Sequence, residues 1–326
     1  MSALRVAVLY GGRSGEHEVS LRSAEAVMEA LERRGYRVAP YLIAKDGRWH
    51  PGPILPAPGA NPDIDVVFPV LHGTFGEDGT VQGLLEMAAL PYVGAGVFAS
   101  AAAMDKELFK RLCRERGLPV VDYVVIRPGE TGAAEAARRF GFPVFVKPAN
   151  LGSSVGIHKA HDAKELEAAL ADAARYDTKV LVERAIAGFE LECAVLGNRE
   201  PAASTPCQIY PSREFYDYED KYVLDKARAV IPAEVPAATI REVQRLAVEC
   251  YRAVDCAGMG RVDFLVESAT GKVFINELNT IPGFTSISMY PKMWAYDGVP
   301  MPELVHRLVE LALERFRERQ ALRYER

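Results

Sequence analysis

The sequence lacks the features that mark several special classes of protein. It contains five cysteines, an odd number, and no two of them form a Cys-x-x-Cys pair, so neither a zinc site nor a disulfide framework is expected. No run of about 18 apolar residues is present to span a bilayer, and the opening strand-like segment does not have the pattern of a secretory signal. We therefore expect the cysteines to be reduced thiols of the core and the protein to be cytoplasmic.

An excess of positive charge is also lacking. The chain has 39 lysines and arginines against 44 aspartates and glutamates, for a net charge of -5 at pH 7. This balance provides no long-range attraction for nucleic acid or for an anionic membrane surface, although a local basic pocket can still bind a small anion. A small molecule is the expected partner, and neither nucleic acid nor a membrane is.

Length and hydrophobic pattern predict a mixed α/β protein with three domains. A chain of 326 residues is longer than a single hydrophobic core usually supports. Apolar strand-like runs alternate with segments of helical period, which is typical of sheets covered by helices. The domains are expected at residues 1–104, 105–185 and 186–326. Strands are expected at 4–10, 36–43, 65–73, 91–94, 120–126, 142–148, 179–186, 261–267 and 272–278, and helices at 18–34, 80–90, 98–116, 131–140, 162–174, 236–254 and the C-terminal end.

Two late strands carry polar residues that could bind a metal ion. Arg261 and Asp263 share one face of the first strand, and Glu277 and Asn279 share one face of the second, because residues two apart in a strand point the same way. The short turn between the strands predicts a hairpin, which would bring Asp263, Glu277 and Asn279 together. Their oxygen atoms suit Mg²⁺. An ordinary hairpin with solvent-facing polar residues explains the spacing about equally well.

The segment VKPANLGSSVGI, residues 146–157, could cradle a phosphate group. Lys147 ends a strand and supplies a positive charge, and Gly152 lets backbone amides approach an anion. Ser153 and Ser154 add hydroxyl donors. The segment is neither a P-loop nor a dinucleotide-binding fingerprint. On local grounds alone, a flexible loop is the more common use of such a stretch.

Polar residues also follow two early strands, at the edge where α/β sheets bind ligands. In GGRSGEHEVS, Glu16 and Ser20 could hold a cationic group, and in LHGTFGEDGT, His72 lies near the same edge. A helix N-cap followed by acidic residues accounts for the first segment without a ligand. A single histidine is more often structural. Both interpretations stay open on these residues alone.

Two further segments have the composition of a lid and of an anion site. YDYEDKY contributes Tyr216, Lys221 and Tyr222, which could close over a reactive phosphate and exclude water. Aromatic residues beside charges also occur in ordinary surface loops. In NTIPGFTSIS, the Gly283 amide and the Ser288 hydroxyl directly follow the candidate metal ligands. They suit a carboxylate or a developing oxyanion.

Taken together and in order, these motifs resemble those of the D-alanine:D-alanine ligases of the ATP-grasp fold. The resemblance extends from about residue 4 to residue 300. The motifs that carry it are GGRSGEHEVSL, LHGTFGEDGTVQGLLE, MDK at 104–106, VKPANLGSSVGI, VLVERAIAGFE, FYDYEDKY, GRVDF and INELNTIPGFTSIS. Such a series in a consistent order is far more specific than any one of its members, so the alternative readings of the single motifs lose most of their weight.

The resemblance implies an ATP site between the central and C-terminal domains. Lys106 and Lys147 would contact the phosphates, and the Ser-rich loop would close over them. Glu183 and the backbone near Ile186 would lie beside the adenine, and Glu190 would hold the ribose. The implied ATP-binding residues are Lys106, Lys147, Ser153, Ser154, Glu183, Ile186, Glu190, Tyr216, Lys221, Phe274 and Asn279.

The same resemblance implies a dipeptide-forming reaction. The carboxylate of the first D-alanine would attack the γ-phosphate of ATP, and the amino group of the second D-alanine would attack the resulting acyl phosphate. Asp263, Glu277 and Asn279 would hold two Mg²⁺ or Mn²⁺ ions. Arg261 and the Gly283 amide would stabilise the tetrahedral oxyanion. The product is a peptidoglycan precursor, and ligases of this kind are commonly homodimers.

The resemblance also implies how the two substrates are held. Glu16 would anchor the ammonium group of the first D-alanine and would be linked by hydrogen bonds to Ser153 and Tyr222. Ser288 would bind the carboxylate of the second. The implied substrate-binding residues are Glu16, His72, Ser288 and Met289, and the implied catalytic residues are Glu16, Ser153, Tyr222, Arg261 and Gly283.

Two other functions make different demands on the sequence. A different ATP-grasp ligase, such as a D-alanine:D-lactate ligase, would differ in the first-substrate segment or in the lid segment. FYDYEDKY matches the dipeptide-forming pattern, so D-alanine is predicted to be preferred over D-lactate. A catalytically silent nucleotide-binding protein would lack at least one metal ligand or phosphate lysine, and the sequence has all of them.

We predict that Tyr222→Phe weakens the preference for D-alanine over D-lactate as second substrate. Loss of the hydroxyl would loosen the hydrogen bonds around Glu16. The measurement is the ratio of dipeptide to depsipeptide formed when both second substrates compete at equal concentration. The same ratio in the variant and the parent would contradict the prediction.

Overall fold

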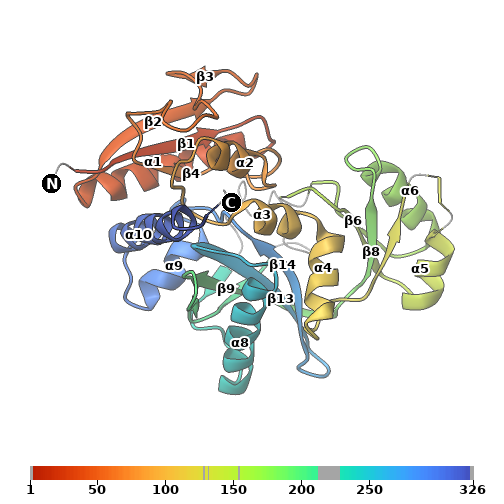
Figure 1. Cartoon of the computed structure of the whole chain (residues 1–326). Coiled ribbons are helices and arrows are strands. Elements are labelled where there is room, and N and C mark those ends of the chain that lie inside the picture. The colour runs from red at the N-terminus through yellow and green to blue at the C-terminus, as the bar shows by residue number, and fades with distance from the viewer. Residues whose placement is uncertain (1–2, 128, 131, 153–154, 212–227, 324–326) are drawn as a thin grey trace.

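A computed structural model describes residues 3–127, 129–130, 132–152, 155–211 and 228–323. Five candidate residues lie outside these ranges: Ser153, Ser154, Tyr216, Lys221 and Tyr222. The described residues form three sheets, which Figure 1 shows in the upper part, at the right and in the lower part of the molecule. None of the described helices combines the length and the apolar character needed to cross a membrane. All five cysteines are buried thiols, as predicted.

The N-terminal sheet consists mainly of parallel strands, which is typical where strands alternate with helices. Its order is β3-β2-β1-β4, with β3 antiparallel to β2 and the other neighbours parallel. Helix α1 ends shortly before Gly35, whose φ of 82° lets the chain turn back into the sheet. The elements are β1 (Arg5–Gly11), α1 (His17–Arg33), β2 (Arg37–Ile43), β3 (Trp49–His50), β4 (Val66–Pro69) and α2 (Thr80–Met87). The strand expected at 91–94 is only a bridge between Tyr92 and Val67, because the chain turns away at Gly94, where φ is 92°.

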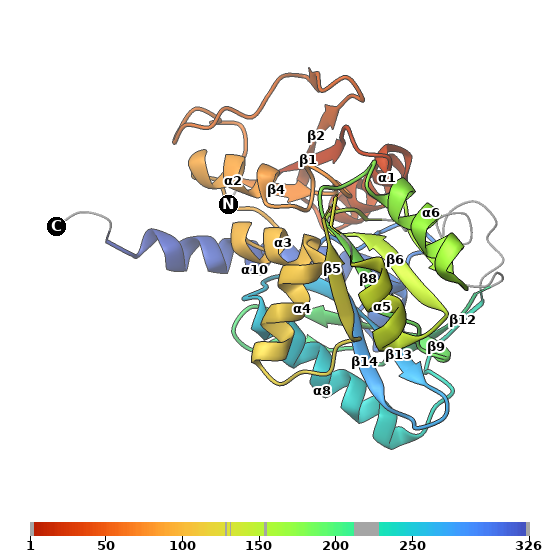
Figure 2. The ribbon, with the colours of Figure 1, turned by 90° about the vertical axis from the view of Figure 1, so that its right-hand side faces the viewer.

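The central sheet is antiparallel and is covered by two helices. Its order is β5-β8-β6-β7, and Figure 2 shows α5 and α6 beside these strands. Ala136 of α5, Val146 of β6 and Leu166 of α6 belong to one apolar core. The elements are β5 (Tyr123–Ile126), α5 (Ala133–Phe140), β6 (Val144–Pro148), β7 (His158–Ala160), α6 (Ala163–Ala173) and β8 (Val180–Arg184).

The C-terminal sheet has one apolar face, and its opposite face is polar around Glu190 and Glu192 and apolar where it packs against the N-terminal sheet. Its antiparallel order is β12-β11-β9-β13-β14, with β10 beside β9. On β9, Leu191, Cys193 and Val195 belong to the core that contains α8, and Glu190 and Glu192 alternate with them toward the opposite face. The elements are β9 (Gly188–Leu196), β10 (Ala202–Ala203), β11 (Cys207–Tyr210), β12 (Arg228–Val230), α8 (Ala237–Ala253), β13 (Met259–Glu267) and β14 (Val273–Asn279). The polar face is therefore the one available for a site.

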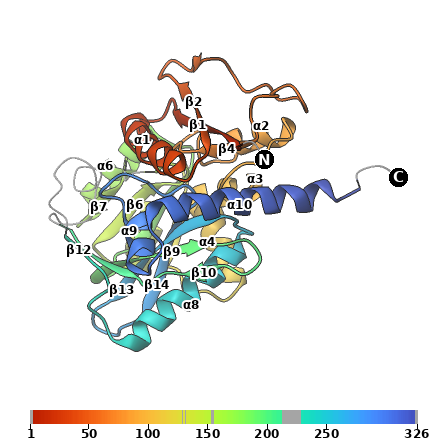
Figure 3. The same ribbon diagram turned by 90° about the vertical axis from the view of Figure 1, so that its left-hand side faces the viewer.

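The last two helices join the C-terminal part of the chain to the N-terminal sheet. They are α9 (Met289–Tyr296) and α10 (Met301–Gln320). Tyr290 of α9 and Leu308 of α10 share a core with Val8 and Phe68 of the N-terminal sheet. Figure 3 shows α10 as the long blue helix that passes beside α1. Apolar packing thus sets the N-terminal sheet against the end of the chain.

The single helix expected at 98–116 is two helices. α3 (Val97–Met104) and α4 (Lys106–Glu115) meet at Asp105, whose backbone is extended with ψ of 100°. The Asp105 carboxylate accepts hydrogen bonds from the backbone N–H groups of Glu107 and Leu108, at 3.0 and 3.1 Å. Aspartate favours this capping position. The apolar periodicity continues through the break, so the pattern alone predicted one helix.

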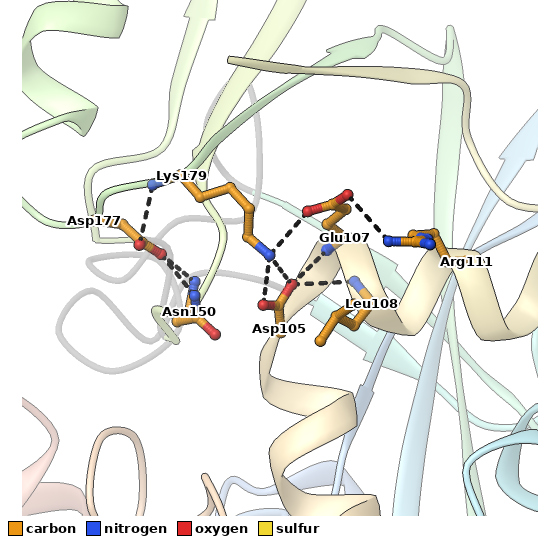
Figure 4. A network of polar contacts seen from close by, with 7 residues as sticks. All are labelled: Asp105, Glu107, Leu108, Arg111, Asn150, Asp177 and Lys179. Atoms are coloured by element: carbon orange, nitrogen blue, oxygen red, sulfur yellow. Dashed lines mark hydrogen bonds and ion pairs between the residues drawn. The ribbon is translucent and has the colours of Figure 1, made fainter. Parts of the chain in front are cut away.

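The cap also belongs to a network of charged and polar groups, which Figure 4 shows from close by. Lys179 Nζ lies 2.6 Å from Asp105 Oδ2 and 2.9 Å from Glu107 Oε2. Asp177 accepts a hydrogen bond from the backbone N–H of Asn150 at 2.6 Å. The start of α4 and the segment before β8 are thereby linked to each other and to the loop after β6. The first residues of the candidate phosphate loop are anchored in this way.

We predict that Asp105→Ala lowers the free energy of unfolding more than Asp162→Ala does. The exposed Asp162 caps α6 by accepting the N–H of Glu165 at 2.9 Å, so its loss should cost about 1 kcal/mol. Asp105→Ala removes a similar cap and also takes a partner from the largely buried Lys179, for a total of about 2–3 kcal/mol. Urea denaturation measures both values. Equal losses would show that the ion pair with Lys179 adds nothing to stability.

Candidate active site

Two cavities meet where the three sheets come together. The larger, about 540 Å³, lies between the central and C-terminal sheets, and the smaller lies between the N-terminal part and the C-terminal sheet. Lys106, Leu151, Gly152 and Glu277 line both of them. A molecule that fills one cavity can therefore touch a molecule that fills the other at this shared wall.

A buried glutamate lies between two lysines in the wall of the larger cavity. Glu183 Oε1 is 3.0 Å from Lys110 Nζ, and Glu183 Oε2 is 2.8 Å from Lys147 Nζ. Burial alone would raise the pKa of Glu183, but the charges of Lys110 and Lys147 lower it to about 2. Burial also lowers the pKa of Lys110, whereas for Lys147 the attraction of Glu183 outweighs burial and the pKa is raised. Lys147 is thereby kept protonated at the cavity.

Lys106 reaches the same region from the start of α4. Its Nζ donates a hydrogen bond of 2.6 Å to the Leu151 carbonyl, and its backbone N–H donates one of 2.9 Å to the Ala149 carbonyl. Lys147 donates a hydrogen bond of 3.2 Å to Asn276 Oδ1. Two ammonium groups thus lie beside the loop after β6, where they can neutralise the oxygen atoms of a polyphosphate.

The β13–β14 hairpin brings the predicted metal ligands together, so the hairpin prediction is confirmed. Asp263 lies opposite Glu277 and Arg261 lies opposite Asn279, and the register shifts after Asp263. The Asn279 amide donates a hydrogen bond of 3.0 Å to Asp263 Oδ2. Arg261 donates two hydrogen bonds of 2.7 Å to the same carboxylate, from Nε to Oδ1 and from Nη2 to Oδ2.

The oxygen atoms of this hairpin fit a hard divalent cation. Two carboxylates and one amide oxygen are donors that Mg²⁺ and Mn²⁺ accept. Within the described ranges, no group of three or more His, Cys, Asp or Glu side chains is arranged to hold a metal ion. The hairpin contributes only two such side chains, so the coordination shell would be completed by substrate phosphates and water. The residues fit a cation that arrives with a nucleotide.

Glu16 and Glu77 approach the loop after β6 from the N-terminal part of the chain. A Cβ atom built on Gly152 would lie 3.1 Å from Glu16 Oε2 and 3.9 Å from Glu77 Oε1. Glu16 occupies the N-cap position of α1, but its side chain makes no capping hydrogen bond. Burial, and then repulsion by Glu16, raise the pKa of Glu77 to about 8. Glu77 therefore keeps its proton at neutral pH and offers a hydroxyl donor beside Glu16.

His72 and Ser20 both have structural partners. The buried His72 donates from Nδ1 to the Ile281 carbonyl at 3.0 Å, and its Nε2 is 3.4 Å from Ser23 Oγ. Burial lowers the pKa of His72, so the ring is neutral, and it lines the smaller cavity. Ser20 is buried and bonds backbone groups of β1 and of the segment after β4. The prediction that Ser20 could hold a cationic ligand is wrong, because the local pattern did not reveal these backbone partners.

The segment after β14 sets a glycine against a serine hydroxyl. A Cβ atom on Gly283 would lie 2.7 Å from Ser288 Oγ, so a larger residue would displace the hydroxyl. Ser288 Oγ accepts a hydrogen bond of 3.0 Å from the backbone N–H of Thr285. Gly283, Ser288 and Met289 all line the smaller cavity. This corner can offer N–H and O–H donors to an anion.

The predicted nucleotide residues differ in how they lie relative to the two cavities. Those that line the larger cavity are Lys106, Lys147, Glu183, Ile186 and Glu190, and Asn279 lines the smaller. Phe274 lines neither cavity. Its buried ring lies beneath the guanidinium of Arg184, 5.4 Å from the ring centroid, and Arg184 lines the larger cavity in its place. The direct contact of Phe274 with ATP therefore stays a prediction.

Sequence reasoning missed three polar residues of this region. Lys110 lies one helical turn after Lys106, and this spacing could have indicated it. Glu192 alternates with Glu190 on the same face of β9. Glu77 lies in the segment LHGTFGEDGT, where only His72 was singled out. Glu77 and Glu192 have no local pattern that distinguishes them from solvent-exposed charges.

The chain matches two family models that together cover most of its length. The model described as D-ala D-ala ligase N-terminus matches residues 5–62 and 55–95, and the one described as D-ala D-ala ligase C-terminus matches residues 112–310. A D-alanine–D-alanine ligase from Solibacter usitatus (strain Ellin6076) is 62% identical over 323 residues, which are 99% of each chain. One from Caldicellulosiruptor bescii is 45% identical over 360 aligned positions, again 99% of each chain.

Solved structures with similar folds include two ligases. The D-alanine–D-alanine ligase from Coxiella burnetii superposes with a TM-score of 0.88 at 37% identity, covering 98% of this chain and 97% of the other. The VanG D-Ala:D-Ser ligase from Enterococcus faecalis has a TM-score of 0.87 at 35% identity, covering 95% and 99%. The similarity extends over essentially the whole chain in both cases.

We predict that Glu183→Gln removes a pH-dependent part of the stability. The folded pKa of Glu183, about 2, lies below its ordinary value of 4.5. The ionised carboxylate therefore stabilises the fold above pH 4.5, and this contribution, roughly 3 kcal/mol, is lost as the pH falls from 4.5 toward 2. At neutral pH the variant should also be less stable, because two buried lysines lose their counter-charge.

The free energy of unfolding, measured in urea between about pH 3 and pH 7, tests this prediction. Glu242→Gln is the matched control, since Glu242 forms an exposed ion pair of 2.7 Å with Arg245. The control should keep nearly the full pH profile of the parent. Parallel profiles for the parent and Glu183→Gln would contradict the prediction.

Proposed function

The chain belongs to the D-alanine–D-alanine ligase family, and from that premise we propose how its residues carry out the reaction. It joins two D-alanine molecules with the use of ATP, and the product serves peptidoglycan synthesis. The observation that carries the proposal is the wall shared by the two cavities. ATP in the larger cavity and D-alanine in the smaller would meet at Lys106, Gly152 and Glu277.

In the larger cavity, the nucleotide would extend from the end of β8 to Lys106 and Lys147. The backbone near Ile186 would contact the adenine, and Glu190 would accept hydrogen bonds from the ribose hydroxyls. Lys106 and Lys147 would neutralise the phosphate oxygens. Glu183, held by lysines on both of its oxygens, would keep Lys147 in place.

The hairpin would hold two Mg²⁺ or Mn²⁺ ions through Asp263, Glu277 and Asn279. Divalent cations at this place offset the negative charge that develops on the transferred phosphoryl group. The oxygen donors of the hairpin support this assignment, and the metal identity is part of the proposal. Ser153 and Ser154 are proposed to close over the phosphates.

In the first step, the carboxylate of the first D-alanine attacks the γ-phosphorus of ATP. The bond from that phosphorus to the β-γ bridging oxygen breaks, which yields an acyl phosphate and ADP. Glu16 would hold the ammonium group, with the protonated Glu77 beside it and Ser153 and Tyr222 linked to it. Held there, the carboxylate would face the shared wall and the γ-phosphate, so that positioning supplies much of the catalysis.

In the second step, the neutral amino group of the second D-alanine attacks the acyl carbon. Arg261 and the Gly283 N–H would stabilise the oxyanion of the tetrahedral intermediate. Phosphate then leaves with the electron pair of the broken C–O bond, and the nitrogen loses a proton to leave the peptide bond. Ser288 would bind the carboxylate of the second D-alanine, with Met289 beside it.

The assembly, the location and the second substrate complete the proposal. We propose that the chain forms a homodimer and works in the cytoplasm, where ATP is available. One of the similar solved structures is a D-Ala:D-Ser ligase, and the lid segment distinguishes dipeptide from depsipeptide formation. D-Serine and D-lactate are therefore the second substrates to compare with D-alanine.

Incubation with ATP, Mg²⁺ and D-alanine tests the proposal, with ADP and the ligated product measured together. We expect D-alanyl-D-alanine and ADP in equal amounts, and less product when D-serine or D-lactate competes. A depsipeptide as the main product would favour the alternative, a D-alanine:D-lactate ligase. ADP without any ligated product, or no turnover at all, would overturn the proposal.

We predict that Arg261→Ala lowers kcat strongly and leaves the KM for ATP nearly unchanged. Arg261 lines the smaller cavity and is not part of the lining of the larger one. Loss of an oxyanion donor costs about 3 kcal/mol or more of transition-state stabilisation, which is roughly a hundredfold in kcat. Arg245→Ala, on the exposed face of α8, is the control. An unchanged turnover number for Arg261→Ala would refute the role.

A further inference from the structure

Three carboxylates lie in a row across three adjacent strands of the C-terminal sheet. Glu192 of β9 is opposite Asp263 of β13, and Asp263 is opposite Glu277 of β14. Directly paired residues of neighbouring strands point to the same face, so all three belong to the cavity face. The family resemblance implies roles for Asp263 and Glu277, and none for Glu192.

Glu192 is buried and shares a cation with its neighbour. Only 3% of Glu192 is exposed, and its Oε2 lies 3.3 Å from Arg261 Nε. The same guanidinium forms two hydrogen bonds with Asp263. One arginine therefore lies between two carboxylates on adjacent strands. A buried carboxylate costs free energy unless it is paired, so the contact with Arg261 stabilises Glu192.

Glu192 and Asp263 differ in their proposed roles, so a bound metal ion would affect their contacts with Arg261 differently. Asp263 is a proposed metal ligand, and a divalent cation bound there repels the guanidinium and weakens its attraction to Asp263. Glu192 stands outside the proposed ligand set. Glu192 can keep its contact with Arg261 when Asp263 turns to the metal.

We propose that Glu192 is a positioning residue that keeps Arg261 at the oxyanion site and draws its guanidinium away from Asp263 when the metal binds. The inference rests on the proposed function, in which Arg261 stabilises the oxyanion and Asp263 binds the cation. It adds that the two roles are coupled through one residue of β9. Without Glu192, the guanidinium would lose one of the two carboxylates that share it and would compete more strongly with the metal for Asp263.

The test compares Glu192→Gln and Glu192→Asp with the parent enzyme. We expect Glu192→Gln to lower kcat about tenfold, an ordinary coupling for contacting charged groups, with the KM for ATP changed less than about twofold. We also expect about threefold to tenfold weaker binding of Mn²⁺ in the presence of a non-hydrolysable ATP analogue, measured by electron paramagnetic resonance. Glu192→Asp keeps the charge and should recover part of both effects.

A double variant that combines Glu192→Gln with Arg261→Ala distinguishes a positioning role of Glu192 from a purely structural one. If Glu192 acts through Arg261, adding Glu192→Gln to Arg261→Ala should leave kcat unchanged from the single Arg261→Ala variant. A purely structural role would lower kcat by the same factor in both backgrounds, and this result would overturn the proposal. Thermal unfolding of each variant checks folding, and Glu249→Gln, which removes a glutamate from an exposed pair with Arg245, controls for the loss of one charge.

The outcomes also distinguish this inference from the proposed function. A parent enzyme that forms no dipeptide would contradict the proposed function. If the parent is active and Glu192→Gln matches Glu249→Gln in both kcat and Mn²⁺ binding, only the inference about Glu192 is contradicted. Weaker Mn²⁺ binding that is not accompanied by a lower kcat would also overturn it, because the guanidinium would then be in place without Glu192.

Discussion

The register of three adjacent strands is the constraint on which the rest of the site depends. On β13, Val262 and Phe264 enter the core beneath α8, and Arg261 and Asp263 alternate with them toward the cavity. A slip of one residue would carry the charged side chains into the apolar core and the apolar ones into the cavity. The cost of burying unpaired charge excludes that register. The packing that stabilises the sheet therefore also determines where the site lies.

Charge pairing across elements holds the polar face together. Glu183 of β8 is paired with Lys110 of α4 and Lys147 of β6, and Arg261 is paired with carboxylates of β9 and β13. Glu183 and Glu192 thus find counter-charges on other elements, whereas Asp263 finds one on its own strand. These pairs stabilise the fold only when the whole arrangement is present, because removing one member leaves an uncompensated charge in a buried place. Lys106 and Lys147 line the cavity where phosphates are proposed to bind.

Helix α4 connects the apolar core of the C-terminal sheet to the loop of the central sheet. Phe109 on its buried face belongs to the core that contains α8. Its first turn holds Lys179 and contacts the backbone of the loop after β6. A single helix therefore relates the position of the candidate phosphate loop to that of the hairpin.

The sequence by itself determined most elements of the N-terminal and central parts of the chain, the β13–β14 hairpin and the shared face of Asp263 and Glu277. These depend on local facts, namely strand periodicity, a short turn and the residues that end helices. The tertiary structure alone decided the break at Asp105, the covering of Phe274 by Arg184 and the pairing of Glu192 with Arg261. Each of these needs residues from separate elements to meet, and a buried charge or a backbone donor takes whichever partner the packing brings near. Such partners leave no period in the sequence, so only the folded chain reveals them.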